Sequence, residues 1–179
     1  MITKRIRANA PAKIYPSAIV MDGAEIGSDV MVGAFCFVAS RAKIGSGSRI
    51  QSHTSVWDGV VLKENVFVGP AAMFTNVKHP RVEYPRQGSF DRTLVSKGAT
   101  IGARAVLVAP VKVGRYAIVG AGAVVIKNVP AHAIVVGNPA RVVGWACECG
   151  QTIAKTVSRP KHAKCTHCGA VFPANTGTA

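Results

Sequence analysis

Four cysteines near the C-terminus have the types and the spacing of a metal site. They form two pairs, each followed by glycine: Cys147-Glu148-Cys149-Gly150 and Cys165-Thr166-His167-Cys168-Gly169. Four thiolates at this spacing suit a tetrahedral zinc ion, and the glycines permit knuckle turns. We therefore expect a structural zinc-ribbon-like segment over residues 145–170, with His162 or His167 as substitute ligands. The alternative is four free cysteines on a flexible tail.

A second group of reactive side chains lies between residues 75 and 94. His79, in Lys78-His79-Pro80-Arg81, is the candidate general base, since histidine titrates near neutral pH. Asn76 could orient a nucleophile or a carbonyl group, or could simply start a turn. Arg81 and Arg86 could bind phosphate bidentately, or could belong to a solvated loop.

The elements that must hold these residues repeat every six positions. An aliphatic or aromatic residue returns at this spacing from Ile14 to Phe74 and again from Val95 to Val125, with a small residue four places later. Six residues suit one short strand and a turn, and such units bury their apolar faces only by stacking. The pattern predicts an all-β fold, a parallel β-helix with one large and one small residue inside each face.

Glycine often follows the large residue directly, as at Gly33 and Gly102, and we expect it to supply a positive φ at each corner. The repeat is broken between Phe74 and Val95, so residues 75–94 are expected to form a loop insertion. His53 and Trp57 occupy outward positions, where they could bind substrate. Trp57 could stack on a base or sugar, or pack between subunits.

Length and composition set further bounds. The 179 residues suit one domain with a small appendage: a lead-in at 1–12, the β-helix at 13–144, the ribbon at 145–170 and a tail at 171–179. The formal charge of +14 favours anionic ligands such as nucleotides, coenzyme A or nucleic acid. No apolar run suits a membrane span or a signal peptide, so we expect a cytoplasmic protein with reduced thiols.

Three short motifs resemble those of known enzymes: Phe67-Val68-Gly69-Pro70, Gly120-Ala121-Gly122-Ala123-Val124-Val125, and Val136-Gly137-Asn138-Pro139-Ala140-Arg141. Residues 13–144 resemble the hexapeptide-repeat acyltransferases, most closely the nucleotide-sugar 3-N-acetyltransferases. The resemblance implies a left-handed β-helix. It also implies acetyl-CoA-dependent acetylation of the 3-amino group of a UDP- or dTDP-linked amino sugar, for surface polysaccharides such as lipopolysaccharide.

The same resemblance implies where the cosubstrate binds. Acetyl-CoA would lie along the last coils, against Ala103, Ala121, Val136, Asn138, Pro139 and Arg141, with Arg141 contacting a phosphate. A homotrimer would close this groove, because hexapeptide enzymes place a neighbouring subunit against it. The His-Pro setting of His79 also resembles hexapeptide O-acetyltransferases, so a sugar O-acetyltransferase with His79 as general base is the alternative.

Two other functions share some of these features. A γ-type carbonic anhydrase has the same fold but needs three zinc-bound histidines, and His53, His79 and His132 lack the close pairing of such a site. The basic ribbon could bind nucleic acid through Lys155, Arg159, Lys161 and Lys164. The ribbon lacks interleaved aromatic residues, so nucleic-acid binding is the less favoured function.

Overall fold

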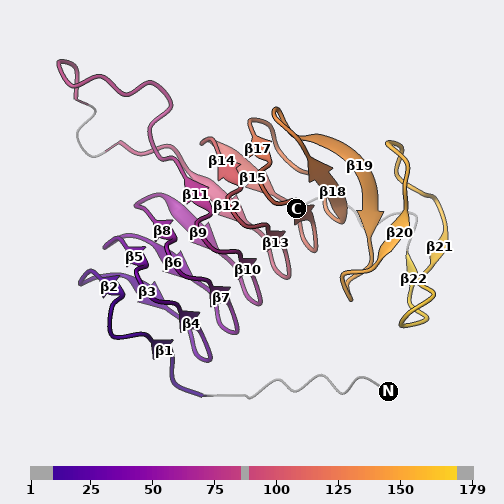
Figure 1. Cartoon of the computed structure of the whole chain (residues 1–179), viewed down its shortest axis with the longest axis horizontal. Helices are drawn as coiled ribbons and strands as arrows, with labels where there is room; N and C mark the ends of the chain where they lie inside the picture. Colours follow the sequence, from indigo (N-terminus) through magenta and orange to yellow (C-terminus); the bar gives the residue numbers. More distant parts are fainter. Residues whose placement is uncertain (1–9, 86–88, 173–179) are drawn as a thin grey trace.

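The computed structural model describes residues 10–85 and 89–172, which form a solenoid of short strands (Figure 1). Three sheets run along the solenoid, and we name them A, B and C in the order in which the chain enters them. The strands from β1 to β18 pair in parallel, and one turn of the solenoid takes 18 residues, as the offset between Asp58 and Asn76 illustrates. The parallel β-helix predicted from the six-residue repeat is confirmed.

Most strands are two or three residues long. The strands of sheet A, in spatial order, are β1 (Lys13–Ile14), β4 (Met31–Val32), β7 (Arg49–Ile50), β10 (Phe67–Val68), β13 (Thr100–Ile101), β16 (Ile118–Val119), β18 (Ala133–Val136), β19 (Arg141–Ala146) and β20 (Thr152–Ala154). Those of sheet B are β2 (Ile19–Val20), β5 (Phe37–Val38), β8 (Ser55–Val56), β11 (Met73–Phe74), β14 (Val106–Leu107) and β17 (Val124–Val125). Those of sheet C are β3 (Glu25–Ile26), β6 (Lys43–Ile44), β9 (Val60–Leu62), β12 (Thr93–Val95) and β15 (Val111–Val113).

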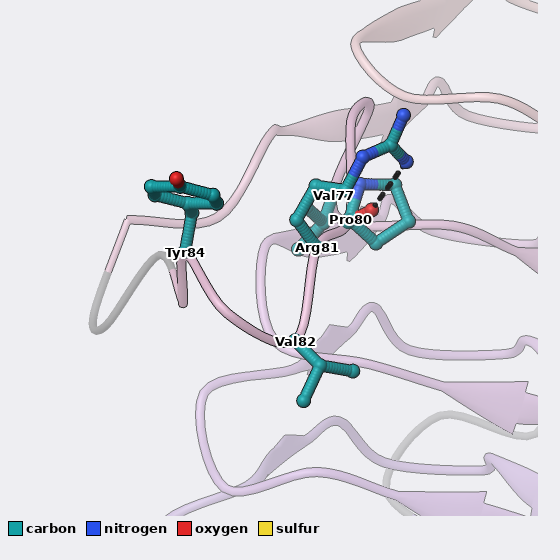
Figure 2. A pocket seen from close by; sticks show the side chains of 5 residues that line it. All are labelled: Val77, Pro80, Arg81, Val82 and Tyr84. Carbon is teal, nitrogen blue, oxygen red and sulfur yellow. Dashed lines mark hydrogen bonds between the residues drawn. The ribbon is translucent and has the colours of Figure 1, made fainter.

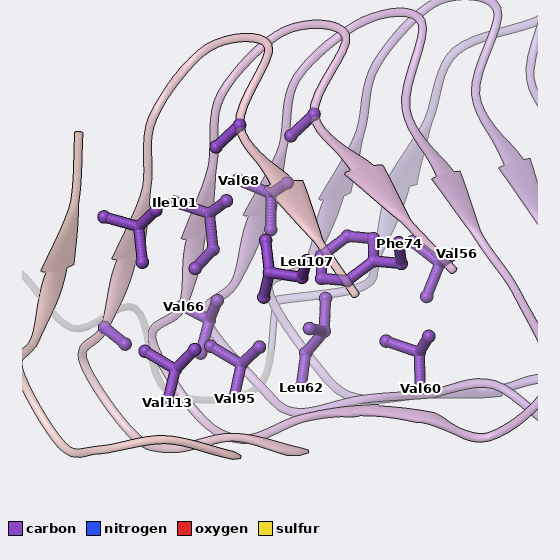
Figure 3. Close-up of a cluster of buried hydrophobic side chains, with 14 of the residues drawn as sticks. Val56, Val60, Leu62, Val66, Val68, Phe74, Val95, Ile101, Leu107 and Val113 are labelled. Carbon is purple, nitrogen blue, oxygen red and sulfur yellow. The ribbon is translucent and has the colours of Figure 1, made fainter. Parts of the chain in front are cut away.

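The repeated large residues fill the interior of the solenoid (Figure 3). Ile50, Ile101 and Leu107 are fully buried, and the small-residue register, including Ala105, is buried beside them. The first coil is the exception, because Ile14 is 44% exposed at the open end of the stack. Both registers therefore face inward as predicted, and burial becomes complete only where a coil is covered on both sides.

The glycines beside the large residues have a different role from the one expected. A Cβ on Gly33 would lie 2.8 Å from the backbone nitrogen of Ser52, and one on Gly102 would lie 2.4 Å from that of Ala121. Neither glycine has a positive φ. The left-handed residue comes two places later, and it is often not glycine, as at Phe35 and Arg104. These glycines are required because successive coils approach too closely for a side chain.

The loop insertion leaves the solenoid after β11 and returns at β12 (Figure 1). The repeat pattern predicted that the loop ends at residue 94, whereas Thr93 already pairs with Val60 of sheet C. At the base of the loop, Asp91 N–H donates to the Asn76 carbonyl (2.8 Å), and Lys78 N–H donates to the Asp91 carboxylate (2.8 Å). The loop is therefore tied firmly at its base.

The C-terminal segment continues sheet A in the antiparallel sense. Strand β19 pairs with β18 and with β20, and it crosses the predicted boundary at residue 144. A separate hairpin, β21 (Ala163–Lys164) with β22 (Val171–Phe172), completes the ribbon at the end opposite to β1 (Figure 1). Residues 171 and 172 thus belong to a strand, and the rest of the predicted tail lies outside the described residues.

In the part of the chain that the structure describes, no helix could cross a membrane.

Candidate active site and metal centre

The A/B corner, formed by the turns that follow the strands of sheet A, carries most of the residues predicted to bind coenzyme A. Ala103 and Ala121 are in consecutive turns, and Gly122 N–H donates to the Ala103 carbonyl (2.8 Å). The next turn, residues 137–140, is fixed by two hydrogen bonds: Val124 N–H to the Gly137 carbonyl (2.9 Å), and Ala140 N–H to the Val124 carbonyl (2.8 Å). Val136, Asn138, Pro139 and Arg141 are exposed around this turn. Along the coils of β13, β16 and β18, the A/B corner is thus a continuous exposed ridge, which we call the coenzyme ridge.

His53 lies on the same corner but nearer to β1, in the turn after β7. Its ring is 5.1 Å from that of Phe35 in the preceding coil, and Phe35 is 64% exposed. Both residues have a positive φ, which aims their side chains out of the turn. His53 therefore shares a ridge with the predicted coenzyme residues, and Phe35 extends its aromatic surface.

Trp57 and Asn76 lie at the B/C corner, formed by the turns that follow sheet B. Trp57 is 40% exposed and its ring is 5.0 Å from Phe37. Asn76 is half-buried, and its Nδ2 donates to the Asp58 carbonyl (3.2 Å). Asn76 thus joins the base of the loop to the coil below, while its predicted catalytic role remains a prediction.

The loop itself carries His79 and Arg81, both exposed. An open hollow of about 300 Å³ is lined by Val77, Pro80, Arg81, Val82 and Tyr84. Figure 2 shows how these side chains are arranged on the loop. Val82 is 97% exposed and Tyr84 75%, so the apolar side chains of the loop have little cover within one chain. Arg86 lies outside the described residues.

The two groups of predicted site residues lie on opposite edges of sheet B. The loop leaves at the B/C corner, whereas His53, Ala103 and Ala121 line the A/B corner. The outer face of sheet B between them is largely apolar, with Ile19 59% exposed and Met73 61% exposed. One chain alone does not bring the candidate base and the coenzyme ridge together.

The four cysteines converge closely. Their sulfur atoms all lie within 4.8 Å of one another, with Cys147 to Cys168 at 3.5 Å and Cys149 to Cys165 at 3.6 Å. A tetrahedral zinc with Zn–S bonds of about 2.3 Å requires sulfurs roughly 3.8 Å apart, so the donor set fits. Hydrogen bonds from the backbone N–H groups of Cys168 and then His167 lower the pKa of Cys165 to about 6, whereas burial raises the pKa of Cys147 to about 12.

An aromatic cluster that the sequence did not reveal packs the ribbon onto the solenoid. His132 lies in the last coil, with its ring 5.5 Å from Tyr116 and 4.9 Å, edge-on, from Phe172. The Arg159 guanidinium lies over Phe172 (5.2 Å) and over Trp145 (6.0 Å), which is buried. Burial lowers the pKa of His132, so its neutral form is favoured in the folded protein.

The three histidines considered for a carbonic anhydrase site lie apart in this chain. His53 is at the A/B corner, His79 is on the loop from the B/C corner, and His132 is buried under the ribbon. Among the described residues, the four cysteines form the one group of histidine, cysteine or acidic side chains with metal-site geometry. The four cysteines are therefore the candidate metal site among the described residues.

Several functional candidates were missed because their partners are one turn away. Phe35 precedes His53 by 18 residues, the same offset that separates Asp58 from Asn76. Reading the sequence in columns of 18 would have shown both contacts. Arg104, exposed beside Ala103 on the A/B corner, would have emerged in the same way.

Comparison with known proteins agrees with this geometry. Residues 92–127 match the model of the bacterial transferase hexapeptide family (six repeats). The chain is a hexapeptide-repeat protein. A curated relative, the dTDP-3-amino-3,6-dideoxy-alpha-D-galactopyranose 3-N-acetyltransferase of Aneurinibacillus thermoaerophilus, is 54% identical over 61 residues. That match covers 34% of this hexapeptide-repeat protein and 32% of the relative, so the chain spans about a third of it.

Solved structures share the solenoid. A mutant of GDP-perosamine N-acetyl transferase from Caulobacter crescentus, in complex with CoA and GDP-perosamine, is 26% identical with a TM-score of 0.66. The match covers 76% of the hexapeptide-repeat protein and 58% of that chain. The acetyltransferase domain of PglB from Neisseria gonorrhoeae, in complex with acetyl coenzyme A, is 25% identical with a TM-score of 0.65. That match covers 75% of the hexapeptide-repeat protein and 58% of the PglB chain.

Proposed function

We propose that this protein is an acetyl-CoA-dependent N-acetyltransferase acting on the 3-amino group of a nucleotide-linked amino sugar, dTDP-linked in preference to UDP-linked. The observation that carries the proposal is the 54% identity over 61 residues with a dTDP-3-amino-sugar 3-N-acetyltransferase. The product would serve surface polysaccharide synthesis. Structures with the same solenoid, crystallised with CoA or acetyl coenzyme A, support the choice of cosubstrate.

The reaction sets the demands on the site. The neutral amine nitrogen attacks the thioester carbonyl, the C–S bond breaks, CoA leaves as its thiol, and the amine loses a proton. The site must orient the amine, stabilise the oxyanion and accept that proton. His79 is the proposed proton acceptor, and Asn76, at the base of the same loop, is proposed to orient the amine.

The A/B corner is the proposed acetyl-CoA site. Backbone groups at Ala103 and Ala121 would bind the arm of the coenzyme, and the 137–140 turn with Arg141 would bind the adenine and phosphates. The charge of the second half of the chain supports this location of the coenzyme site. Glu148 is the one acidic residue among the described residues 92–172. Eleven basic residues lie in the same range: Arg92, Lys97, Arg104, Lys112, Arg115, Lys127, Arg141, Lys155, Arg159, Lys161 and Lys164. Such an excess attracts the phosphates of a coenzyme.

The nucleotide sugar is proposed to bind at the lower coils. The exposed rings of His53 and Trp57 could stack on the base or sugar, and Arg81 and Arg86 could hold the pyrophosphate. Phe35 and Phe37, in contact with the two rings, enlarge the aromatic surface available to the substrate.

We propose that the protein assembles as a homotrimer through sheet B. The apolar side chains on the outer face of this sheet, such as Ile19 and Met73, are exposed in one chain, and the loop also lacks cover. The loop and the coenzyme ridge lie on opposite edges of the same sheet. A threefold arrangement would bring the loop of one chain to the ridge of the next and would cover both surfaces.

We propose that the four cysteines hold one structural zinc ion per chain. The sulfur separations suit tetrahedral coordination, and cysteines supply all four ligands without an open position for catalysis. Cys147 and Cys165 are buried and Cys149 and Cys168 exposed, so the site lies at the surface. Thiolates of this kind persist in the reducing cytoplasm, which is the proposed location.

Acetyl-CoA turnover against matched acceptors tests the main proposal. Thiol release and product mass would be measured with dTDP- and UDP-linked 3-amino sugars and with the corresponding 3-hydroxy sugars. We expect N-acetylation of a 3-amino sugar and no turnover of its hydroxyl analogue. Turnover of the hydroxyl sugar alone would instead establish the O-acetyltransferase alternative, with His79 as its general base.

A further inference from the structure

Strand β19 joins the proposed metal site directly to the proposed coenzyme site. It begins at Arg141, immediately after the 137–140 turn, and ends at Ala146, immediately before Cys147. A six-residue strand is about 20 Å long. Strand β18 pairs with β19 along Arg141–Trp145, and β20 pairs with its last two residues, Trp145 and Ala146, so β19 is held over its whole length. No loop therefore separates the metal ligand from the coenzyme turn.

At the coenzyme end, the turn depends on the strands behind it. Val136 pairs with Arg141 and Val135 with Val142, and a register shift lies between Ile134 and Val135. The turn itself is largely exposed and is attached to the solenoid by the two hydrogen bonds at Val124. A small displacement of β19 would therefore move the turn.

At the metal end, β19 is held between the last coil and the ribbon. Ala146 N–H donates to the His132 carbonyl (2.7 Å), and the Ala146 carbonyl lies 3.1 Å from His132 Nδ1. Phe172, which follows the second cysteine pair, packs edge-on against the same histidine at 4.9 Å. Phe172 and His132 therefore connect the segment that follows the second cysteine pair to β19.

Apart from the contacts of Phe172, Arg159 and Trp145 described above, the ribbon is built from short strands. Strands β20, β21 and β22 have two or three residues each, and a two-stranded hairpin of this size is marginal in water. Exposed side chains such as Val157 and Val171 add no core. Metal ligation, which joins Cys147 and Cys149 to Cys165 and Cys168, would supply the missing stabilisation.

We infer that metal binding by the ribbon positions the 137–140 turn, so that metal loading tightens CoA binding through β19, His132 and Phe172. The inference rests on the proposed function and names Phe172 and His132 as positioning residues. By linkage, the coupling is reciprocal, and CoA must raise the affinity for zinc by the same factor. The nucleotide-sugar site, on lower coils, should not share this coupling.

Calorimetric CoA binding to the full chain, with and without zinc, tests the coupling. Three variants would be compared with the zinc-loaded protein: Cys165→Ser, which removes a ligand; Phe172→Ala, which keeps all four ligands; and Val20→Ala, which weakens the open first coil. We expect the first two to raise the Kd for CoA roughly 5- to 20-fold, a typical coupling between linked sites. Phe172→Ala should retain zinc, and Val20→Ala should lower the Tm without changing the Kd for CoA.

Hydrogen exchange at residues 137–146 gives a readout that does not need CoA. Zinc removal and Phe172→Ala should both accelerate exchange there, and Val20→Ala should not. An unchanged Kd and unchanged exchange in folded, zinc-free protein would overturn the inference. Faster exchange without any CoA binding by the zinc-loaded protein would instead sustain the mechanical link and refute the proposed coenzyme site.

Discussion

The side-chain amide of Asn76 donates a 3.2 Å hydrogen bond to the main-chain carbonyl of Asp58, which lies one turn earlier in the solenoid. This contact fixes the base of the loop that carries His79. Because an amine acceptor supplies its own neutral nucleophile, we predict that His79→Ala lowers kcat by less than about tenfold. Asn76→Ala should cost at least as much, because it removes the anchor and disturbs positioning.

Steady-state kinetics of both variants would check this, with Glu83→Gln on the same loop as the control. A hydroxyl acceptor would require a base, and His79→Ala would then reduce turnover by roughly 10² to 10⁴. A thousandfold loss in kcat at unchanged affinity for acetyl-CoA would therefore contradict amine acetylation and favour O-acetylation.

The trimer prediction can be tested at the face of sheet B. Met73→Glu places a charge on the proposed apolar interface and should convert the trimer into monomers with little acetyltransferase activity. Lys112→Glu, an exposed change on sheet C, is the matched control and should leave the trimer intact. Light scattering at micromolar concentration gives the mass. A monomeric wild-type protein, or a trimeric Met73→Glu variant, would rule out this interface.

Elemental analysis should find about one zinc per chain in protein purified without chelator. Cys149→Ser removes an exposed ligand and should abolish stoichiometric zinc. Cys36→Ala should keep the zinc, because Cys36 is buried in the solenoid and its thiol donates to the Gln51 carbonyl (3.1 Å). Wild-type protein free of zinc would refute the metal site.

Two glycines should respond to alanine in different ways. Gly102→Ala forces a Cβ to within 2.4 Å of the Ala121 nitrogen, so we predict a loss of about 3 kcal/mol or more in the free energy of unfolding. Gly122→Ala meets no neighbouring atom within 4 Å, but it keeps a φ of +69°, so the loss should be about 1 kcal/mol. Denaturant unfolding of both variants measures the difference, and equal losses would show that the coils can separate to admit the methyl group.

His132 should make stability depend on pH. Burial lowers its pKa below the ordinary value of 6.5, so on acidification the unfolded chain takes up a proton before the folded protein does. The free energy of unfolding should therefore fall as the pH drops below about 6.5. His132→Gln should lose less stability than the wild type between about pH 7.5 and pH 5.5 in zinc-containing buffer. Parallel losses in the two proteins would exclude His132 as the cause.

The fold could be predicted from sequence because its signal is repeated in every coil. Ile50, Ile101 and Leu107 occupy the predicted register and are buried, and the four cysteines converge as their spacing indicated. The predicted role of the glycines was wrong. Spacing shows where glycine recurs, but it does not show whether a positive φ or a close neighbour makes glycine necessary. Gly33 and Gly102 illustrate the second reason.

The packing of the ribbon could not be predicted in the same way. Trp145, His132 and Phe172 follow no repeat, and their contacts join segments far apart in sequence. The site was only partly predictable for a related reason. His79 lies on the predicted loop and Ala103 lies in one of the last coils, but the sequence does not show that sheet B separates them.

The spacing of the coils fixes the axial distance between the loop and the 137–140 turn. The loop leaves the coil of β10, and the 137–140 turn leaves that of β18, three steps further along sheet A. At about 4.8 Å a step, the two are roughly 14 Å apart along the axis. Removing one 18-residue coil between them would preserve every corner yet shorten this separation by about 4.8 Å. The axial distance between the loop and the proposed coenzyme turn is thus set in whole coils, and cannot be adjusted gradually.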